Sequence, residues 1–480
     1  MRVHLVGVSG SGMGALAALF WQAGDQVSGS DMAFDPPAGP LLRALGVRCL
    51  LTYDPAHLDP RPDLVVVGNA IRRDNPEAQA AERLGVERLS MSAALRRHFL
   101  AKRRPLVVTG THGKTTTSAM CAWLLSRAGY EPGWFIGGAP KGLSGSANIG
   151  STRVKPDRGR SPFVVEGDEY DAVYWHKEPK FFDYVGVGSD DVVIVTSIEH
   201  DHIDIYPDVG SYEGAFRTLV RRVPAGGLLV CDAHTARVRA IVADEATARV
   251  AWVALEGDDT ASVTPTWLGA PAAFTADGAQ TFDLYAGGVA CGRFAMRAPG
   301  RHNVRNAVAA IAACAEGFGI RVDDARAHLR QFDGVRRRQD LLGEPRGVRV
   351  YDDFAHHPTA VDETLRALRA RHPDGALWAA FEPRSATACR ALHQHAYARA
   401  FASADHVLLA PLGRSNVPPG ERLDLDQLAR DLGPKAIAMP SVDAIVARLA
   451  ADSRSGDTVA LLSNGTFGGI GEKLLVALGA

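Results

Sequence analysis

The sequence lacks the features that mark secreted, membrane-spanning and nucleic-acid-binding proteins. Its six cysteines are scattered with no Cys-x-x-Cys or zinc-type spacing, so we expect reduced, mostly buried thiols in a cytoplasmic protein. No apolar run approaches the ~20 residues that a bilayer-spanning helix needs, and the chain starts with an expected strand rather than a signal peptide. The formal net charge of −1 gives no overall attraction to nucleic acid or anionic membranes.

The composition is that of an ordinary globular chain with several domains. Hydrophobic residues make up 46% of the 480 positions, and at roughly 150 residues each this length predicts about three domains. Short apolar runs alternate with helical stretches, which predicts α/β domains with doubly wound, mainly parallel sheets. We place the domains at residues 1–104, 105–322 and 323–480, with the basic stretch Lys102–Pro105 as the first linker.

The expected strands are short apolar runs, several of which end in glycine or acidic residues. They lie at 3–6, 26–31, 64–67, 106–108, 163–165, 192–197, 348–351, 378–381, 406–409 and 458–462. Helices are expected at 15–22, 115–127 and 307–315, the second of them closed by Gly129. Residues 151–161 are polar and predict a loop, and residues 253–300 predict a small antiparallel patch.

One glycine-bracketed turn carries the strongest functional signal. An apolar run leads into Gly110-Thr111-His112-Gly113-Lys114-Thr115-Thr116, and a helix follows. Backbone N–H groups at such a helix N-terminus point at an anion, and the helix dipole favours negative charge. The turn, although two residues shorter than the general pattern, predicts that Lys114 reaches nucleotide phosphates and that the Thr115 hydroxyl binds Mg²⁺. A plain glycine turn with a solvated lysine would leave the co-occurrence of strand, loop and helix unexplained.

A second glycine-rich turn follows the first strand. Residues Gly7-Val8-Ser9-Gly10-Ser11-Gly12-Met13-Gly14 are similar to a dinucleotide-binding turn, although Ser9 stands where its second glycine belongs. Asp31 closes the second strand, where such a site places its ribose-binding acid. The turn predicts a diphosphate at a helix N-terminus, which NAD, FAD and a UDP-sugar would fit equally. A tight turn used only for packing is the alternative.

Two acidic clusters come directly after expected strands. The first is Glu166-Gly167-Asp168-Glu169-Tyr170-Asp171, whose carboxylates suit Mg²⁺ if the strand ends beside the phosphate loop. The second is Glu199-His200-Asp201-His202-Ile203-Asp204, whose imidazoles and carboxylates suit a second divalent ion or a phosphate contact. A solvated acidic turn is the alternative for the first cluster. Zinc fits the second by ligand type, but neither cysteine nor helical spacing supports it.

The last third of the chain adds polar clusters at turns and strand ends. Gly300–Asn306 precedes an alanine-rich helix, and Asn303 either caps this helix or lies on a face that reaches a purine base. Arg336-Arg337-Arg338 offers guanidinium forks for phosphate or carboxylate, although such runs are usually solvated. In Tyr351–Pro358, we expect the histidines to face the crevice above the sheet. Arg384 stands alone at a strand end, so it is a more specific candidate anion ligand than the arginine run.

Taken in order, these motifs resemble those of the Mur ligases, the ATP-dependent amide-forming enzymes of peptidoglycan assembly. The matching segments are Gly110–Thr116, Glu166–Glu169, Glu199–Asp204, Gly300–Asn306 and Asp353–Thr359. The resemblance covers nearly the whole chain. It implies a Rossmann-like N-terminal domain for a UDP-sugar, a central P-loop ATPase domain, and a Rossmann-like C-terminal domain for the acceptor.

Within the family, four segments resemble the recycling branch more than the branch that adds L-alanine. The recycling branch joins UDP-N-acetylmuramate to the murein tripeptide L-Ala-γ-D-Glu-meso-diaminopimelate. The four segments are Pro179–Tyr184, Phe354-Ala355 in place of Tyr-Gly, Glu382–Ser385 and Ser463–Gly469. Two departures from the family pattern, Gly167 and His200, lie beside the expected ligands rather than among them.

The resemblance also assigns roles to individual residues, with ATP and Mg²⁺ as cofactors. The expected catalytic residues are Lys114, Glu166, His202, His357 and Arg384. Thr115 and Glu166 would hold one Mg²⁺, and His202 would help to hold a second. Asn303 and Asn306 would contact the adenine of ATP, and Asp352 or Asp353 would contact its ribose. The other expected ATP contacts are Gly110, Thr111, His112, Gly113, Lys114, Thr115, Thr116 and Arg337. The expected substrate contacts are Ser9, Gly10, Ser11, Gly12, Met13, Asp31 and Asn69 for UDP-N-acetylmuramate, and His357 and Arg384 for the tripeptide.

Three other functions remain open at this stage. Ligation of free L-alanine is the same reaction with a smaller acceptor. A nicotinamide-dependent oxidoreductase would account for Gly7–Gly14 but not for the Lys114 loop. A P-loop regulatory ATPase would account for that loop but would have no acceptor. On the ligase interpretation we expect small-molecule substrates, no nucleic-acid or membrane partner, and a monomer or weak dimer.

Overall fold

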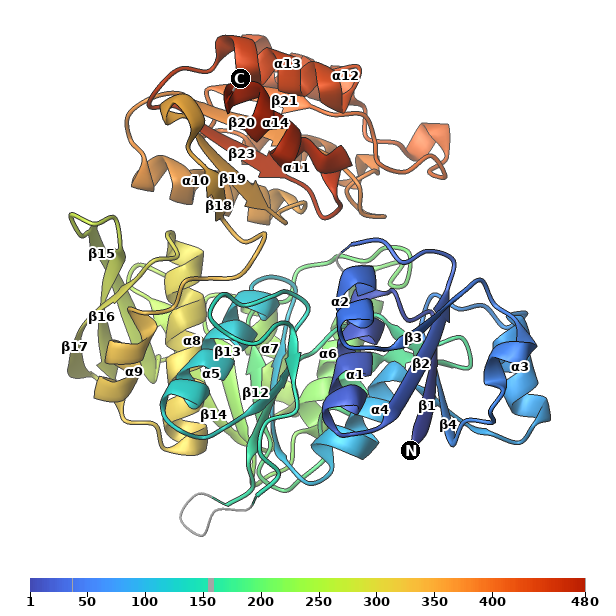
Figure 1. Ribbon diagram of the computed structural model, residues 1–480. Coiled ribbons are helices and arrows are strands. Elements are labelled where there is room, and N and C mark those ends of the chain that lie inside the picture. The colour runs from blue at the N-terminus through green and yellow to red at the C-terminus, as the bar shows by residue number, and fades with distance from the viewer. Residues whose placement is uncertain (37, 154–158, 480) are drawn as a thin grey trace.

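The chain folds into three α/β domains, each built around its own sheet (Figure 1). The computed structural model describes residues 1–36, 38–153 and 159–479. The expected three-domain α/β architecture is confirmed. Part of the loop expected at 151–161 lies outside the described residues. Within the described ranges, no helix combines the length and the apolar character that a membrane crossing would require.

The first domain is a five-stranded parallel sheet in the order β3-β2-β1-β4-β5. Its strands are β1 Arg2–Val6, β2 Gln26–Asp31, β3 Arg48–Leu51, β4 Leu64–Val67 and β5 Glu87–Ser90. Its helices are α1 Ser11–Gln22, α2 Ala38–Ala44, α3 Pro76–Arg83 and α4 Met91–Leu95. All four residues of β4 are buried, as the continuous apolar run of an inner parallel strand requires. The edge strands β3 and β5 are largely exposed or half-buried and each contains an arginine, so neither is a continuous apolar run.

The central domain is a ten-stranded sheet in the order β17-β16-β15-β14-β13-β12-β6-β9-β7-β8. Its strands are β6 Arg104–Thr109, β7 Gly133–Phe135, β8 Ala147–Asn148, β9 Pro162–Glu166, β12 Val192–Val195, β13 Leu228–Asp232, β14 Arg249–Leu255, β15 Trp267–Phe274, β16 Gln280–Ala286 and β17 Val289–Met296. A separate hairpin pairs β10 Asp171–Val173 with β11 His176–Pro179. The helices are α5 Lys114–Arg127, α6 Val209–Arg222, α7 Ala236–Glu245, α8 Arg301–Phe318 and α9 Val322–Leu329. The antiparallel patch expected at 253–300 is present as β15–β17, which extend this sheet because β15 pairs with β14.

Three expectations for the central domain need correction. Lys102–Pro105 is not a free linker, because Arg104 opens β6 and Arg103 is buried against Phe163. The strand expected to run to residue 197 ends at Val195, and the hydroxyl of Thr196 bonds to the carbonyl oxygens of Thr109, the last residue of β6, and of His112 in the loop that follows. The border drawn after residue 322 would separate α9 from its neighbours, since α9 packs on α5 and β17.

The third domain is a six-stranded sheet in the order β18-β19-β23-β20-β21-β22, parallel except for β18. Its strands are β18 Asp340–Gly343, β19 Arg349–Asp353, β20 Leu377–Phe381, β21 His406–Leu409, β22 Ala436–Ala438 and β23 Thr458–Leu462. Its helices are α10 Pro358–Arg371, α11 Gln394–Ala400, α12 Leu425–Leu432, α13 Val442–Asp452 and α14 Ile470–Gly479.

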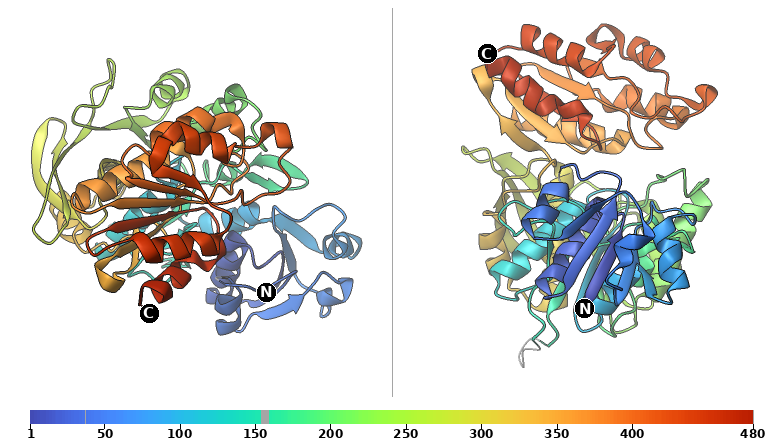
Figure 2. Two further views of the ribbon diagram at one scale, coloured as in Figure 1. Left: turned by 90° about the horizontal axis from the view of Figure 1, so that it is seen from above. Right: turned by 45° about the vertical axis from the view of Figure 1, so that its right-hand side comes forward.

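The arrangement of the domains places strand ends opposite one another. The third domain, orange to red, stands over the central domain, while the first domain, blue, lies at the side of the central domain (Figures 1 and 2). The loops after β6 and β9 and the loop between β19 and α10 line one cavity between the central and third domains. Ligands of open α/β sheets bind beyond the carboxyl ends of the strands, so this junction is the first place to examine for a site.

Candidate active site

A cavity of about 240 Å³ between the central and third domains collects most of the predicted catalytic and nucleotide-binding residues. The predicted residues that line it are Thr111, His112, Gly113, Lys114, Thr115, Thr116, Glu166, His202, Asn303, Asn306, Asp353 and His357. They come from segments more than 200 positions apart in the sequence, and the fold brings them together as the strand ends predicted.

The glycine-bracketed loop has the geometry of a phosphate-binding turn. Gly110 has φ of 121° and Gly113 has φ of 79°, conformations that other residues rarely adopt. A Cβ at Gly110 would lie 2.2 Å from Thr196 Oγ1, so the loop is closely packed there. No side chain among the described residues caps α5, which begins at Lys114. The N–H groups of its first turn therefore remain available to an anion.

Lys114 lies inside the loop rather than in solvent. Its Nζ donates to Gly110 O at 2.6 Å and to Thr111 O at 3.3 Å, and it pairs with Glu169 Oε1 at 3.0 Å. Burial alone would lower the pKa of Lys114, but Glu169 and Glu166 more than offset this and hold it above its ordinary value. The ammonium is therefore charged at neutral pH and lies beside the space where phosphates would bind.

The oxygen ligands expected for Mg²⁺ come together in the structure. Thr115 Oγ1 donates to Glu166 Oε1 at 2.9 Å, and the other oxygen of Glu166 accepts from Gly137 N at 2.7 Å. A hydroxyl and a carboxylate held side by side beside a phosphate loop suit a hard divalent cation. The donor chemistry of this pair therefore fits Mg²⁺.

His202 lies in the same cavity but belongs to a different group of contacts. Its Nε2 is 2.9 Å from Glu169 Oε1 and its Nδ1 is 3.0 Å from the hydroxyl of Tyr170. Burial lowers its pKa, but Glu169 and Asp201 outweigh that effect and raise it. In this structure both ring nitrogens are bonded to protein, so a metal role would require His202 to release one of these partners.

Two acids that were not among the predicted site residues, Glu169 and Asp168, form ion pairs that support this cavity. Glu169 is fully buried and bonds to both Lys114 and His202. Lys180, also buried, donates to Asp168 Oδ2 at 2.6 Å. Burial opposes ionisation of Asp168, but Lys180 more than compensates and lowers its pKa to about 2. Both acids stand in the acidic cluster after β9, but the sequence gives no signal for which carboxylate faces which lysine.

A second cavity of about 340 Å³ adjoins the first. It shares the wall formed by His112, Gly113 and Asn306, and continues along the ends of β12 and β13 and the first turns of α8. Asn306 closely contacts the loop, since a Cβ at Gly113 would lie 2.4 Å from its Oδ1. A nucleotide bound at the loop can therefore extend from one cavity into the other.

The helix-capping alternative for Asn303 is wrong. Helix α8 has Gly300 at its N-cap with no side-chain cap, and Asn303 lies one turn further in. Its Nδ2 donates to Pro299 O at 2.8 Å and to Gln339 Oε1 at 3.2 Å. Asn303 is thus a buried amide that ties α8 to the segment entering the third domain.

The third domain contributes a different arginine from the one predicted. Arg337 turns away from the cavity to Asp352 Oδ2, at 3.1 Å, and to the carbonyl oxygen of Ser463. Arg338 lines the cavity instead, and its Nη2 donates to Thr115 Oγ1 at 3.2 Å. Asp353 also lines it, whereas Asp352 does not. Within a run of three arginines, the sequence alone cannot distinguish which guanidinium faces inward.

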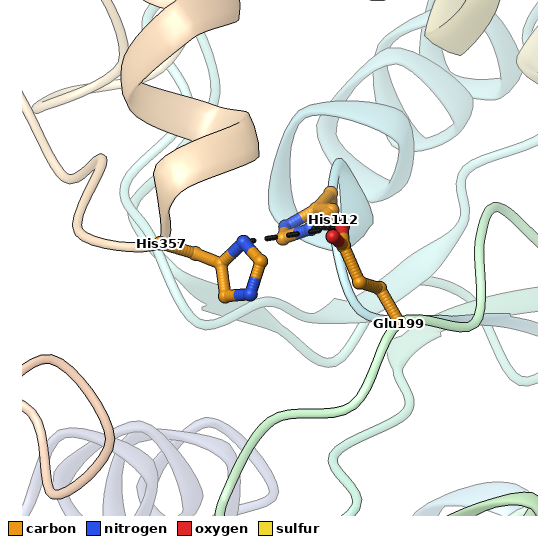
Figure 3. A group of neighbouring side chains, drawn as sticks. All are labelled: His112, Glu199 and His357. Carbon is orange, nitrogen blue, oxygen red and sulfur yellow. Dashed lines mark hydrogen bonds and ion pairs between the residues drawn. The ribbon is translucent and has the colours of Figure 1, made fainter. Parts of the chain in front are cut away.

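Glu199 connects the phosphate loop to the third domain (Figure 3). Its Oε2 lies 2.8 Å from His112 Nε2 and 3.9 Å from His357 Nδ1, and both of its oxygens accept from Thr359 Oγ1 at 2.9 Å. Burial opposes ionisation of Glu199, but the hydrogen bond from His112 is the largest of the effects that outweigh it and lower its pKa to about 2. Burial also lowers the pKa of His357, to about 3. At neutral pH the cluster therefore holds a carboxylate facing a neutral imidazole.

Arg384 is not part of this group. It lines neither cavity described above, and its Nη1 lies 3.6 Å from Glu382 Oε1. The side chain packs over Gly413 and Gly465, where an added Cβ would meet it at 2.8 Å and 2.2 Å. It is 44% exposed, so it is accessible to a ligand that approaches over the ends of β20 and β23.

The predicted diphosphate turn forms a separate cavity in the first domain. Ser9, Gly10, Met13, Asp31 and Asn69 line it. Ser9 N donates to Asp31 Oδ2 at 2.8 Å, so the turn and the acid at the end of β2 are directly linked. The remaining predicted contacts, Ser11 and Gly12, lie in the first turn of α1 and are not among the residues that line this cavity.

Comparison with known proteins assigns the first, central and third domains to the same family. Residues 2–103 match the model described as Mur ligase family, catalytic domain; residues 108–314 match the Mur ligase middle domain; residues 337–465 match the Mur ligase, glutamate ligase domain. A relative of known name from Escherichia coli is 35% identical over 479 residues, which covers the whole chain. The chain belongs to the Mur ligase family.

Individual Mur ligases similar to this chain come from both branches considered above. The E. coli relative, 98% of which is covered, is named UDP-N-acetylmuramate–L-alanyl-γ-D-glutamyl-meso-2,6-diaminoheptandioate ligase. A UDP-N-acetylmuramate–L-alanine ligase from Kineococcus radiotolerans is 37% identical, with 99% of this chain and 95% of the relative covered. A crystal structure of a murein peptide ligase from Psychrobacter arcticus superposes with a TM-score of 0.72 at 32% identity, covering 100% of this chain and 99% of that one.

Membership in the Mur ligase family settles the reaction class. The chain is an ATP-dependent peptide ligase with a three-domain Mur ligase fold. The oxidoreductase and regulatory-ATPase alternatives are therefore set aside. The assignment of individual residues to substrate, nucleotide and metal remains a set of predictions.

Proposed function

We propose that this Mur ligase joins UDP-N-acetylmuramate to L-Ala-γ-D-Glu-meso-diaminopimelate, at the expense of ATP, in peptidoglycan recycling. Similarity to the E. coli and P. arcticus proteins over the whole chain supports the proposal. The single observation that carries it is the cavity between the central and third domains, in which Lys114, Glu166 and His357 meet. Phosphate-binding and acceptor-facing groups belong together in an enzyme that activates a carboxylate and then couples it.

The tripeptide is preferred to free L-alanine because the branch-specific segments lie at the cavity. Phe354 and Ala355, which distinguish the recycling branch in sequence, both line it. The Pro179–Tyr184 segment buries Phe181 and supplies Lys180, which holds the cavity carboxylate Asp168. The L-alanine ligase of K. radiotolerans is 37% identical to this chain, so free L-alanine is the second candidate acceptor.

ATP is proposed to lie with its triphosphate at the Lys114 loop and its base toward the second cavity. The charged Lys114 and the free N–H groups at the start of α5 can neutralise the phosphates. Thr115 and Glu166 would hold Mg²⁺, which would supply positive charge to neutralise the phosphates. Asn306, at the wall shared by the two cavities, is suitably placed for the base.

UDP-N-acetylmuramate is proposed to bind at the turn of the first domain. A short chain of packed residues links this turn to the catalytic cavity. A Cβ at Gly12 would lie 3.8 Å from Phe135, and two residues further along the chain Gly137 donates its N–H to Glu166. The sugar carboxylate can therefore extend from the start of α1 toward Glu166 and the nucleotide.

The chemistry follows from these positions. A carboxylate oxygen of the sugar attacks the γ-phosphorus of ATP, and the bond to the bridging oxygen breaks to release ADP. The amine of the tripeptide then attacks the acyl carbon, and the tetrahedral intermediate expels phosphate and loses the amine proton. Such a sequence depends on positioning and charge neutralisation more than on covalent catalysis. Lys114 and Arg338 supply positive charge beside the phosphates, and His357 faces the cavity from the third domain.

A competition assay tests the acceptor directly. The purified enzyme is incubated with ATP, Mg²⁺, UDP-N-acetylmuramate and equal concentrations of L-alanine, L-Ala-D-Glu and the tripeptide, and products are identified by mass spectrometry. The tripeptide adduct should dominate. Predominant formation of the L-alanine adduct would assign the chain to the other branch, and hydrolysis of ATP with no adduct would contradict a ligase.

A further inference from the structure

Three side chains from three separate segments meet at the boundary between the two cavities (Figure 3). His112 belongs to the phosphate loop, Glu199 follows β12, and His357 is the N-cap residue of α10 in the third domain. One ligand atom from each lies within 4.8 Å of the other two. None of the three belongs to the Thr115–Glu166 pair assigned above to Mg²⁺.

In this cluster, two hydrogen-bond acceptors face each other. Within the described parts of the chain, the ion-pair partners of Glu199 are histidines and not lysine or arginine. His357 Nδ1 accepts a long hydrogen bond, 3.4 Å, from Thr359 N. The lone pair of Nδ1 is therefore only weakly hydrogen-bonded. A carboxylate oxygen and this nitrogen thus face each other at 3.9 Å as two acceptors. A cation between them would remove that conflict.

We propose that His112, Glu199 and His357 form a binding site for a transition-metal ion of the Zn²⁺ class. Zinc bonds of ~2.0–2.1 Å at a tetrahedral angle separate neighbouring ligand atoms by about 3.3 Å. The observed separations of 2.8 Å and 3.9 Å lie on either side of that value, so small side-chain movements complete the site. Two imidazoles favour Zn²⁺ over Mg²⁺, which prefers oxygen ligands.

The site lies between two domains, so a bound ion would link them. Two ligands belong to the central domain and one to the third domain, so a bound ion holds the two domains in the arrangement seen in the structure. An ion that binds only this arrangement stabilises it by RT ln(1 + c/Kd), where c is the free ion concentration. The site thus provides a way for zinc to slow the opening of the enzyme. Its existence does not depend on which acceptor the ligase uses.

Cobalt substitution tests the site without an activity assay. Untagged protein saturated with Mg²⁺ and ADP is titrated with Co²⁺, and the visible absorption bands of four-coordinate Co²⁺ are recorded. Zinc binding is measured in parallel by equilibrium dialysis. We expect one high-affinity ion per chain in the wild type, and an affinity at least ~10-fold weaker in Glu199→Gln, His112→Asn and His357→Asn.

A matched control is His200→Asn. This histidine lies one position from Glu199, but its ring bonds to Tyr206 O, so its loss should leave the cobalt bands unchanged. Circular dichroism identifies any ligand variant that fails to fold. The metal affinities of the remaining ligand variants then test the proposal. The proposal is overturned if the wild type binds no ion beyond those displaced by Mg²⁺, or if the folded ligand variants bind Co²⁺ as well as His200→Asn does.

Discussion

Arg338 of the third domain donates from Nη2 to Thr115 Oγ1 of the central domain at 3.2 Å. Thr115 in turn donates to Glu166 at 2.9 Å, so one chain of hydrogen bonds links an arginine, the loop hydroxyl and the carboxylate proposed for Mg²⁺. Burial lowers the pKa of Arg338, and Asp353 partly compensates. The proposed phosphate site therefore includes a residue from a second domain, as in enzymes that assemble their active site on closure.

Replacement of Arg338 by alanine should reduce kcat by on the order of 10²-fold, because a charged donor at the phosphates is lost. Steady-state kinetics at saturating ATP measure the effect. The neighbouring Arg336→Ala is the control, since Arg336 does not line the cavity, and it should change kcat less than about twofold. Equal losses in both variants would remove Arg338 from the phosphate site.

Lys114→Ala should abolish ADP formation and leave UDP-N-acetylmuramate binding nearly unchanged. The lysine lies in the central domain, whereas the turn proposed for the UDP-sugar lies in the first domain. Coupled-enzyme detection of ADP and calorimetric titration of the UDP-sugar measure the two properties separately. Loss of both together would contradict the assignment of the two ligands to different domains.

Arg384→Ala should raise the KM for the tripeptide or lower kcat, and affect the KM for ATP much less. Arg384 lies outside both nucleotide cavities and is partly exposed over the ends of β20 and β23. A guanidinium there suits a peptide carboxylate, and its loss should cost about 1–3 kcal/mol of transition-state stabilisation. An equal rise in the KM for ATP would argue against an acceptor role.

Acid stability should depend on Glu77, which is fully buried in the first domain. Burial opposes its ionisation, but hydrogen bonds from His4 and Ser30 outweigh this and lower its pKa below 4.5. A depressed pKa contributes stability above the unfolded-state value, and that contribution is lost as the pH falls through the folded-state value. Glu77→Gln should therefore cost about 3 kcal/mol at pH 7 and less at pH 4.

Differential scanning calorimetry at the two pH values measures this difference. Glu82→Gln is the control, because Glu82 pairs with Arg88 at the surface, where its side chain is 63% exposed. That variant should unfold like the wild type at both pH values. A loss of stability in Glu77→Gln that is the same at pH 4 and pH 7 would show that packing, and not the charge, stabilises this site.

The sequence predicts those parts of the molecule that local patterns encode. The buried parallel strands, such as β4 and β12, follow from continuous apolar runs, and the Gly110–Thr116 turn follows from glycine spacing and a helix start. The edge strands β3 and β5 are not predicted, because short, partly exposed strands that contain an arginine lack that pattern. The strand expected to reach Ser197 ends at Val195, where the hydroxyl of Thr196 bonds to Thr109 and to His112 of the phosphate loop.

Local sequence patterns do not show which way a side chain points at the boundary between domains. Arg337 and Arg338 are neighbours of the same type, and only the fold shows that the second faces the cavity. The pairing of Glu169 with Lys114, and of Glu199 with Thr359, joins residues from different strand ends or different domains. Such contacts depend on the packing of whole sheets, which no short motif describes.

The fate of a carboxyl oxygen tests the central claim most directly. UDP-N-acetylmuramate labelled with ¹⁸O in its lactyl carboxylate is incubated with ATP, Mg²⁺, the tripeptide and enzyme, and the released phosphate is analysed by mass spectrometry. Activation through an acyl phosphate predicts one ¹⁸O atom in each phosphate molecule and one in the new amide. Unlabelled phosphate, formed together with the amide, would contradict the account.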